Sequence, residues 1–223
     1  MSAVFSRLDN RLALCADFVR EGARLADIGT DHAYLPVCLC RSGKCPSAIA
    51  ADINPEPLKR GRSTIAEAGM SGCIETRLSN GLQRIGADEV DDIVIAGMGG
   101  ELIAKIIAES DFASDSSKHF ILQPMTKSEY LISWLCENGF KIIKQDCCIA
   151  AEKCYTVLLV QYTGEKCNAD ELYCYLGELS PQTNNTHLRF VENHISRLLK
   201  QSAGDVRFAV LADRLREIIN DKD

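Results

Sequence analysis

The hydrophobic positions of this chain follow two alternating patterns. Short continuous apolar runs, such as Ala48-Ile49-Ala50-Ala51, are typical of strands that are buried on both faces. Between these runs, apolar residues recur every three or four positions, which predicts amphipathic helices. We predict strands at 24–29, 47–53, 74–78, 90–95, 119–122, 141–149 and 154–161. We predict helices at 1–22, 33–40, 57–68, 101–107 and 129–137.

The alternation of strands and helices predicts the fold class. Repeated strand and helix units with continuous apolar strands indicate an α/β protein with a doubly wound, mainly parallel sheet. Pro36 is compatible with the helix at 33–40 only if it lies in the first turn. The last two predicted strands are separated by residues 150–153 alone, a connection short enough for an antiparallel hairpin.

The pattern changes after Tyr162. Residues 163–166 indicate a linker, and Ser180-Pro181 predicts the cap and first residue of a helix. A break at 201–204 separates this helix from a second one, and two antiparallel helices would bury an apolar stripe on each. The stripes consist of Leu188, Val191, Ile195 and Leu198, and of Val206, Val210, Leu211, Leu215 and Ile218. We therefore predict two domains, residues 1–162 and a small helical domain at 163–223.

Composition narrows the class of protein. The 223 residues are 46% hydrophobic and 25% charged, which is typical of a globular chain. No apolar run approaches the roughly 20 residues of a membrane span, and charged residues interrupt the first 20 positions, unlike a secretory signal. Eleven cysteines without paired C-x2-C spacing favour free thiols in a reducing cytoplasm over a metal site. We expect a cytoplasmic protein with no membrane partner and no metal.

Charge is unevenly distributed along the chain. A net charge of −6 argues against indiscriminate nucleic-acid binding, and no DNA partner is expected. Residues 1–80 nevertheless carry +1, so the remainder carries −7, and a polyanion would have to meet a local basic patch. Candidate phosphate contacts are Arg7, Arg11, Arg41, Lys44, Lys59, Arg60 and Arg62, together with His194, Arg197 and Lys200 on the C-terminal helices.

Unusual residues stand at four predicted strand ends, where open parallel sheets bind their ligands. The first strand ends in Asp27-Ile28-Gly29-Thr30-Asp31-His32. Its glycine lets the backbone approach a ligand, and the helix that follows offers free N–H groups. Asp52-Ile53 ends the second strand with a carboxylate placed to accept ribose hydroxyls. Asn80-Gly81 offers an amide to an adenine edge, and Gly97-Met98-Gly99-Gly100 clears side chains from the floor of a cleft.

These residues predict a nucleoside cofactor. Turns and helix caps explain each string taken alone, but the four together favour a binding site. A dinucleotide fingerprint needs three glycines, whereas Asp31 stands at the second glycine position and Ala33 or Tyr34 at the third. A carboxylate would repel a pyrophosphate and suits the sulfonium and ammonium charges of S-adenosylmethionine. Asp27 and Asp31 therefore favour a methyl donor over NAD.

Five strings of the sequence resemble the bacterial tRNA (adenine(22)-N1)-methyltransferase family. They are residues 26–36, 51–54, 77–82, 95–103 and 121–125. The resemblance covers about the first 160 residues in the same order. It implies a class I, Rossmann-like methyltransferase domain followed by a small C-terminal α-helical, coiled-coil-like domain. It also implies S-adenosyl-L-methionine as cofactor and methylation of N1 of an adenine in tRNA, at position 22. Residues 163–180 match no pattern.

Site residues follow from the strand ends and the resemblance. The predicted cofactor-binding residues are Asp27, Gly29, Thr30, Asp31, His32, Asp52, Ile53, Asn80, Gly81 and Gly97. The predicted catalytic residues are Gly97, Met98, Gly99, Gly100, Asp31, Gln123 and Pro124. The glycines would admit a flat base, Gln123-Pro124 would form another wall, and Asp31 and His32 are the titratable candidates for tuning charge.

Adenine N1 carries a lone pair at neutral pH, so its methylation needs no strong general base and depends on positioning. Because N1 lies on the Watson–Crick edge, a paired or stacked target must first be exposed. Two other hypotheses remain open from the sequence. One is a methyltransferase acting on a small-molecule or protein acceptor, and the other is a non-catalytic nucleotide-binding interaction module.

Overall fold

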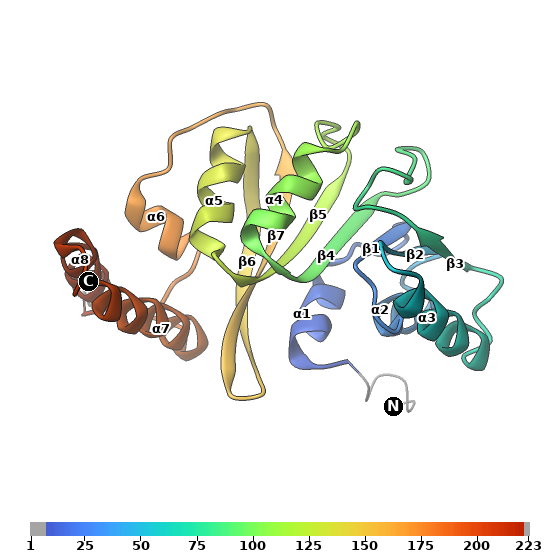
Figure 1. Ribbon diagram of the computed structural model, residues 1–223, viewed down its shortest axis with the longest axis horizontal. Helices are drawn as coiled ribbons and strands as arrows, with labels where there is room; N and C mark the ends of the chain where they lie inside the picture. The colour runs from blue at the N-terminus through green and yellow to red at the C-terminus, as the bar shows by residue number, and fades with distance from the viewer. Residues whose placement is uncertain (1–7, 221–223) are drawn as a thin grey trace.

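A single seven-stranded sheet forms the centre of the protein, which we describe over residues 8–220 of a computed structural model (Figure 1). The strands are β1 (Leu25–Ile28), β2 (Ala48–Asp52), β3 (Ile74–Leu78), β4 (Asp92–Gly99), β5 (His119–Thr126), β6 (Phe140–Ala150) and β7 (Lys153–Tyr162). Their order is β3-β2-β1-β4-β5-β7-β6. The first five strands are parallel, and β7 is antiparallel to both β5 and β6. The predicted doubly wound, mainly parallel sheet is confirmed.

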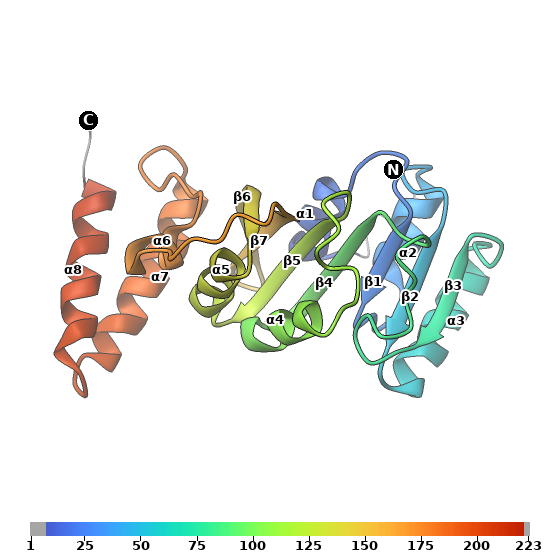
Figure 2. The ribbon, with the colours of Figure 1, turned by 90° about the horizontal axis from the view of Figure 1, so that it is seen from above.

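Helices cover both faces of the sheet. The helices of the sheet region are α1 (Asn10–Phe18), α2 (Tyr34–Arg41), α3 (Pro55–Glu67), α4 (Gly100–Ala108) and α5 (Ser128–Glu137). Neighbouring residues of β4 point to opposite layers: Ile93 and Ile95 pack with α4 and α5, whereas Val94 packs with α1, α2 and α3. Figure 2 shows α4 and α1 on opposite sides of β4 and β5. Burial of each such side chain contributes about 1.5–3 kcal/mol, which is why the continuous apolar runs became central strands.

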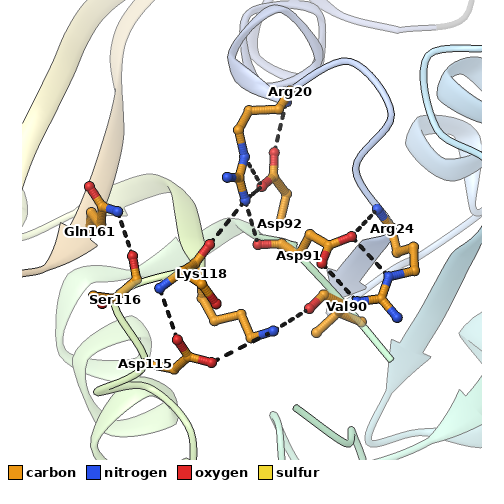
Figure 3. A network of polar contacts seen from close by, with 10 residues as sticks. Arg20, Arg24, Val90, Asp91, Asp92, Asp115, Ser116, Lys118 and Gln161 are labelled. Atoms are coloured by element: carbon orange, nitrogen blue, oxygen red, sulfur yellow. Dashed lines mark hydrogen bonds and ion pairs between the residues drawn. The ribbon is translucent and has the colours of Figure 1, made fainter. Parts of the chain in front are cut away.

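A charged network ties together the amino ends of β1, β4 and β5 (Figure 3). The Asp92 carboxylate is 0% exposed and accepts hydrogen bonds from the Arg20 amide at 2.7 Å and from Arg20 Nε at 2.8 Å. Arg24 pairs with Asp91 at 2.8 Å, and the buried Lys118 Nζ donates to the Val90 carbonyl at 2.9 Å. This end of the sheet is therefore fixed by polar contacts and leaves the carboxyl ends of the strands for a ligand.

The same network explains where the first helix ends. The sequence predicts a helix over 1–22, but α1 ends at Phe18 because Val19 is extended and Asp92 binds the Arg20 amide. The prediction is wrong for 19–22, and its part over residues 1–7 lies outside the described residues. Pro36 lies in the first turn of α2, as its missing N–H requires.

Strands β4 and β5 run further than predicted. Their pairing continues through Ala96 with Gln123, Met98 with Pro124 and Gly99 with Thr126, with register shifts on both sides of Met98. Gly97 lies at the first of these shifts, between Ala96 and Met98, with φ +79°, a conformation that favours glycine. The glycine-rich string is thus a bulged strand tip continuous with the sheet, rather than a loop that follows it.

Three helices follow the sheet: α6 (Glu171–Leu176), α7 (Asn185–Gln201) and α8 (Val206–Asn220). The sequence did not predict α6, which Asp170 caps by accepting from the Tyr173 amide. The predicted helix start at Ser180-Pro181 is wrong, because the Asn184 side chain accepts from the Thr186 and His187 amides and α7 begins one residue later. A capping amide therefore sets the start, not the proline.

The α7–α8 hairpin buries most, but not all, of the predicted stripes. Val191 and Leu198 of α7 pack against Leu215 of α8 in one core cluster. Val206 and Val210 are 73% and 57% exposed, so their predicted burial is wrong. The packed face of α8 runs through Phe208, Leu211, Ala212, Leu215 and Ile219, and this face does not include positions 206 and 210.

The C-terminal helices lie beyond the β6–β7 end of the sheet (Figure 1). His187 of α7 accepts from the Ser180 amide at 3.1 Å through Nδ1, and its Nε2 lies 2.9 Å from Asp146 of β6. Arg197 of α7 pairs with Glu129 of α5 at 2.9 Å. The division into domains 1–162 and 163–223 stays a prediction. Over residues 8–220, no helix has the length and apolar character that a membrane crossing requires.

Candidate functional site

An open cavity of about 820 Å³ lies at the carboxyl ends of β1 and β4. The parallel register sets Ile28 beside both Ala51 and Ile95, so the residues that follow these three positions lie at the same edge of the sheet. The cavity is lined by Asp27, by 29–35, by Ala96 and Gly97, and by Arg11 and Leu12 of α1. The first and fourth predicted strand ends therefore share one cavity.

Asp27 is the buried charge of this cavity. Its side chain is 7% exposed, and burial raises its pKa to about 6. The Thr30 hydroxyl lies close enough to lower that pKa in opposition, yet Thr30 Oγ1 is buried without a hydrogen-bond partner among the described residues. At neutral pH the cavity thus contains a buried, largely ionised carboxylate that suits a cationic ligand.

Gly29 fixes the turn after β1. Its φ is +79°, and a Cβ at this position would overlap Cε of Met98. The Gly29 and Thr30 amides both donate to the Ala51 carbonyl, at 2.8 and 3.0 Å. Only glycine fits this combination of backbone angle and contact. The Met98 side chain is therefore placed over the β1 turn, beside the cavity.

Asp31 and His32 lie at the rim of the cavity. The Asp31 carboxylate is exposed and forms an ion pair with Arg60 of α3, and His32 Nε2 lies 3.5 Å from it. The His32 ring stacks on Tyr34 with centroids 5.0 Å apart. Arg60 thus pairs with a carboxylate at the rim of the cavity, and its role as a phosphate contact stays a prediction.

The second and third strand ends continue the same edge outside the cavity lining. Asp52 pairs with Leu78 in register, and its Oδ1 accepts from the Asn54 amide at 2.7 Å. Ile53 and Asn80 are exposed at this edge, and Gly81 has φ +56°. The structure therefore sets four strand ends side by side, with Asp27 and Gly97 in the cavity and Asp52 and Asn80 next to it. Their ligand roles stay predictions.

A buried glutamine positions the glycine tip of β4. Gln123 is 0% exposed, and its Oε1 accepts from the Gly97 amide at 3.1 Å and from Arg11 Nη1 at 3.0 Å. Its Nε2 donates to the Pro124 carbonyl at 3.0 Å. Gln123 and Pro124 are both buried. Gln123 therefore holds the tip of β4 through the Gly97 amide, and the predicted role of both residues as a wall for the base stays a prediction.

Arg11 is a cavity residue that the sequence did not predict as part of the donor site. Besides its bond to Gln123, it pairs with Asp9 at 2.6 Å and stands over the Tyr155 ring at 5.4 Å from the centroid. It was predicted as a phosphate contact, but it lines the cavity. Gln123 lies 112 residues away in sequence, and nothing near Arg11 in the sequence predicts this contact.

Gly99 and Gly100 are required by close packing. A Cβ on Gly99 would lie 3.3 Å from Thr126 Oγ1, and one on Gly100 would overlap the Lys127 carbonyl. The turn between β5 and α5 therefore rests directly on these glycines. Only Gly97 of the three is exposed, so it is the one that offers open backbone to a ligand.

The other predicted phosphate contacts have varied surroundings. Lys44 Nζ donates to the Ala16 carbonyl at the end of α1, and Arg62 donates to Thr76 Oγ1 at 2.8 Å. His194 is buried, and burial lowers its pKa to about 4, so the prediction that it contacts phosphate is wrong. Arg41, Lys59 and Lys200 are exposed, as is Arg62. Arg7 lies outside the described residues. No group of three or more metal-ligating side chains occurs within residues 8–220.

Comparison with known families matches this geometry to one class of enzyme. A family model described as a methyltransferase domain matches residues 8–158. The tRNA (adenine(22)-N(1))-methyltransferase of Bacillus subtilis is 34% identical over 155 residues, which are 70% of this chain. The match spans 65% of the length of that relative.

Solved structures extend the similarity over nearly the whole chain. A Streptococcus pneumoniae protein described as a candidate tRNA (m1A22) methyltransferase, in complex with S-adenosyl-L-methionine, is 31% identical with a TM-score of 0.83. The similarity covers 96% of this chain and 100% of that one. The TrmK protein of M. capricolum, in complex with S-adenosyl-homocysteine, is 26% identical with a TM-score of 0.76, over 95% and 96% of the two chains.

Proposed function

Because this chain belongs to the methyltransferase-domain family, and within it to the tRNA (adenine(22)-N1)-methyltransferases, we propose that it methylates N1 of adenine 22 in tRNA. The methyl donor is S-adenosyl-L-methionine. The observation that carries the proposal is the shared cavity of Asp27 and Gly97, which joins a buried carboxylate to an open glycine backbone. The reaction belongs in the cytoplasm, because its substrate is tRNA.

The residues at the strand ends fit this donor. The buried Asp27 carboxylate suits its ammonium group, and the unpartnered Thr30 hydroxyl adds a polar group at the same place. Asp52 at the end of β2 is placed for the ribose hydroxyls, and the exposed Ile53 and Asn80 for the adenine. Gly29 and Gly81 form the positive-φ turns that bring these strand ends to the ligand. When bound, the donor supplies a methyl group activated by a positively charged sulfur.

The acceptor base belongs over the exposed tip of β4. Gly97 leaves room for a flat ring, and Gln123 holds that tip by accepting from the Gly97 amide. The N1 lone pair of adenine forms the new bond to the methyl carbon as the carbon–sulfur bond breaks, and the base gains the positive charge. No proton has to leave first, so the chain contributes by alignment, an effect worth up to about 7–11 kcal/mol in ideal cases. Asp31 at the rim supplies a carboxylate near the charge that moves onto the base.

Transfer of a labelled methyl group to defined acceptors tests this proposal. The purified chain, incubated with labelled S-adenosylmethionine, is expected to label unmodified tRNA and not ribosomal RNA, a mixed protein extract or a small-molecule pool. Label in another acceptor would replace tRNA as the substrate. Donor binding without transfer to any acceptor would make the chain a non-catalytic module.

Replacing Asp52 with alanine is expected to weaken donor binding by about tenfold to a hundredfold, since charge-assisted hydrogen bonds contribute about 1.5–3 kcal/mol each. The affinity for tRNA should stay within about twofold. Isothermal titration with S-adenosylmethionine measures the first quantity, and fluorescence anisotropy with labelled tRNA measures the second.

The matched control is Asp213→Ala, which removes an exposed carboxylate of α8 far from the strand ends. Asp52 also accepts from the Asn54 amide at the start of α3, so circular dichroism must show that both variants keep their helices. Wild-type donor affinity in Asp52→Ala would remove the ribose assignment.

A further inference from the structure

A second cavity, of about 490 Å³, opens between the turn from β5 to α5, the start of β7 and helix α7. We call it the α7 cleft. Its walls include Met125, Lys127, Tyr155, Asn193 and Arg197. None of these five residues lines the cavity around Asp27, and the donor site described above does not use them.

The α7 cleft borders the acceptor position from the side away from Asp27. Gly97 lines the donor cavity, while Gly99 pairs in register with Thr126, and Gly100 packs against Lys127. Thr126 and Lys127 line the α7 cleft. A base seated on the tip of β4 would therefore have the donor on one side and this cleft on the other.

Arg11 connects the two cavities. It lines the donor cavity, and its Nη1 lies 3.3 Å from Met125 Sδ in the wall of the α7 cleft. Its guanidinium also stands over the ring of Tyr155, another residue of the cleft. Arg11, held by Gln123 at 3.0 Å, thus lies between the donor cavity and the cleft.

The chemistry of the cleft suits a nucleotide. Both charged side chains that line it, Lys127 and Arg197, are basic, although the chain as a whole carries −6. Each is partly exposed and is held by a carboxylate behind it, Lys127 by Glu101 at 2.6 Å and Arg197 by Glu129 at 2.9 Å. Such cations suit phosphate oxygens, and an aromatic ring with a polar amide beside it suits a base. Tyr155 and Asn193 are those two groups.

We propose that the α7 cleft holds the tRNA nucleotide next to the target adenosine. This inference rests on the proposed function and adds a subsite that the reaction itself does not require. The neighbouring base lies against Tyr155 and Asn193, and its phosphate lies between Lys127 and Arg197. N1 is accessible only when the target is out of the helical stack, so a held neighbour keeps the strand open while the methyl group is transferred.

Blocking the cleft with an indole tests the proposal. Asn193 and Ser196 are both exposed on α7, but only Asn193 lines the cleft. Asn193→Trp is expected to raise the KM for an unmodified tRNA transcript at least tenfold, with the Kd for S-adenosylmethionine within twofold of wild type. Ser196→Trp, the matched control, should leave both constants within twofold.

The phosphate contact has its own matched pair. Lys127 and Lys105 are both exposed lysines that pair with a glutamate, but Lys105 lies on α4 outside the cleft. Lys127→Gln is expected to weaken tRNA binding and to reduce the salt slope of the binding constant by about 1. Lys105→Gln should change neither quantity.

Failure of the subsite and failure of the proposed function give different results. Wild-type tRNA affinity and KM in Asn193→Trp would overturn the subsite while methylation of tRNA continued. Loss of donor binding in Asn193→Trp would also overturn it, because the cleft would then not be separate from the donor cavity. No methyl transfer by the wild-type chain would overturn the proposed function, and weaker tRNA binding by Asn193→Trp in anisotropy would still support the subsite.

Discussion

Replacing Asp27 with asparagine is expected to raise the Kd for S-adenosylmethionine about a hundredfold, which corresponds to about 2.7 kcal/mol. Asparagine keeps the size of the side chain and removes the buried charge that faces the donor cavity. The carboxylate is the only negatively charged group there that is withdrawn from water, so its attraction to the ammonium group is weakly screened. Isothermal titration at pH 7.5 measures the change.

The pH dependence of donor affinity distinguishes loss of the Asp27 charge from a change in the shape of the cavity. Because burial raises the pKa of Asp27 to about 6, donor affinity of the wild type should fall as the pH drops below that value. Asp27→Asn should show no such titration. Equal donor affinity in the two proteins at pH 7.5 would contradict the assignment of Asp27.

Stability gives the control for folding. The folded-state pKa lies above the value of about 3.9 for an unfolded chain, so the ionised carboxyl destabilises the fold increasingly as pH rises from about 4 to 6 and fully above that range. Asp27→Asn removes this cost, which is on the order of 3 kcal/mol. Its Tm without ligand should equal or exceed that of the wild type, and a lower Tm would point to misfolding instead.

Replacing Asp92 with alanine is expected to reduce the free energy of unfolding by about 1.5–3 kcal/mol, the usual contribution of hydrogen bonds to a charged group, because the Arg20 side chain is 41% exposed and stays solvated. The carboxylate is fully buried and holds both the amide and the guanidinium of Arg20. Its loss leaves the Arg20 amide and Nε without an acceptor at the point where α1 joins the sheet, while Nη2 keeps the Asp91 and Ser117 carbonyls (Figure 3). Urea unfolding followed by circular dichroism measures the change.

Asp213→Ala, which breaks an exposed pair with Arg216, serves as the control and should cost less than about 1 kcal/mol. Below the unfolding transition, Asp92→Ala should still bind S-adenosylmethionine, because the network lies at the amino ends of the strands. A destabilisation under 1 kcal/mol in Asp92→Ala would mean that the network does not hold this end of the sheet together.

Local sequence predicts two kinds of feature: elements whose apolar residues repeat at a regular spacing, and turns whose backbone angles require glycine. Continuous apolar runs became β1, β2 and β4, and glycines at strand ends became positive-φ turns such as Gly29 and Gly97. The end of α1 was not predictable in the same way. It depends on an acceptor at Asp92, 72 residues from the Arg20 amide that it binds.

Side-chain partners across the fold account for the other differences. The sequence predicts Gln123 as a site residue that forms a wall of the cleft. Nothing near it in the sequence shows that its oxygen accepts from both Arg11 and the Gly97 amide. Val206 and Val210 fit the spacing of an apolar helical stripe. The face of α8 that is buried is instead the one that packs against α7 and α6. The pairing of Arg60 with Asp31 joins α3 to the turn after β1, and nothing in the local sequence predicts it.

Mass mapping of methylated nucleosides tests whether the chain methylates N1 of adenine 22 in tRNA. Unmodified tRNA transcript, incubated with the chain and S-adenosylmethionine and then digested, should yield one N1-methyladenosine per molecule, at position 22. The Asp27→Asn protein should leave the same position unmethylated at donor concentrations that saturate the wild type. A methyl group on another nucleotide, on another atom of adenine, or on no nucleotide at all would contradict the account.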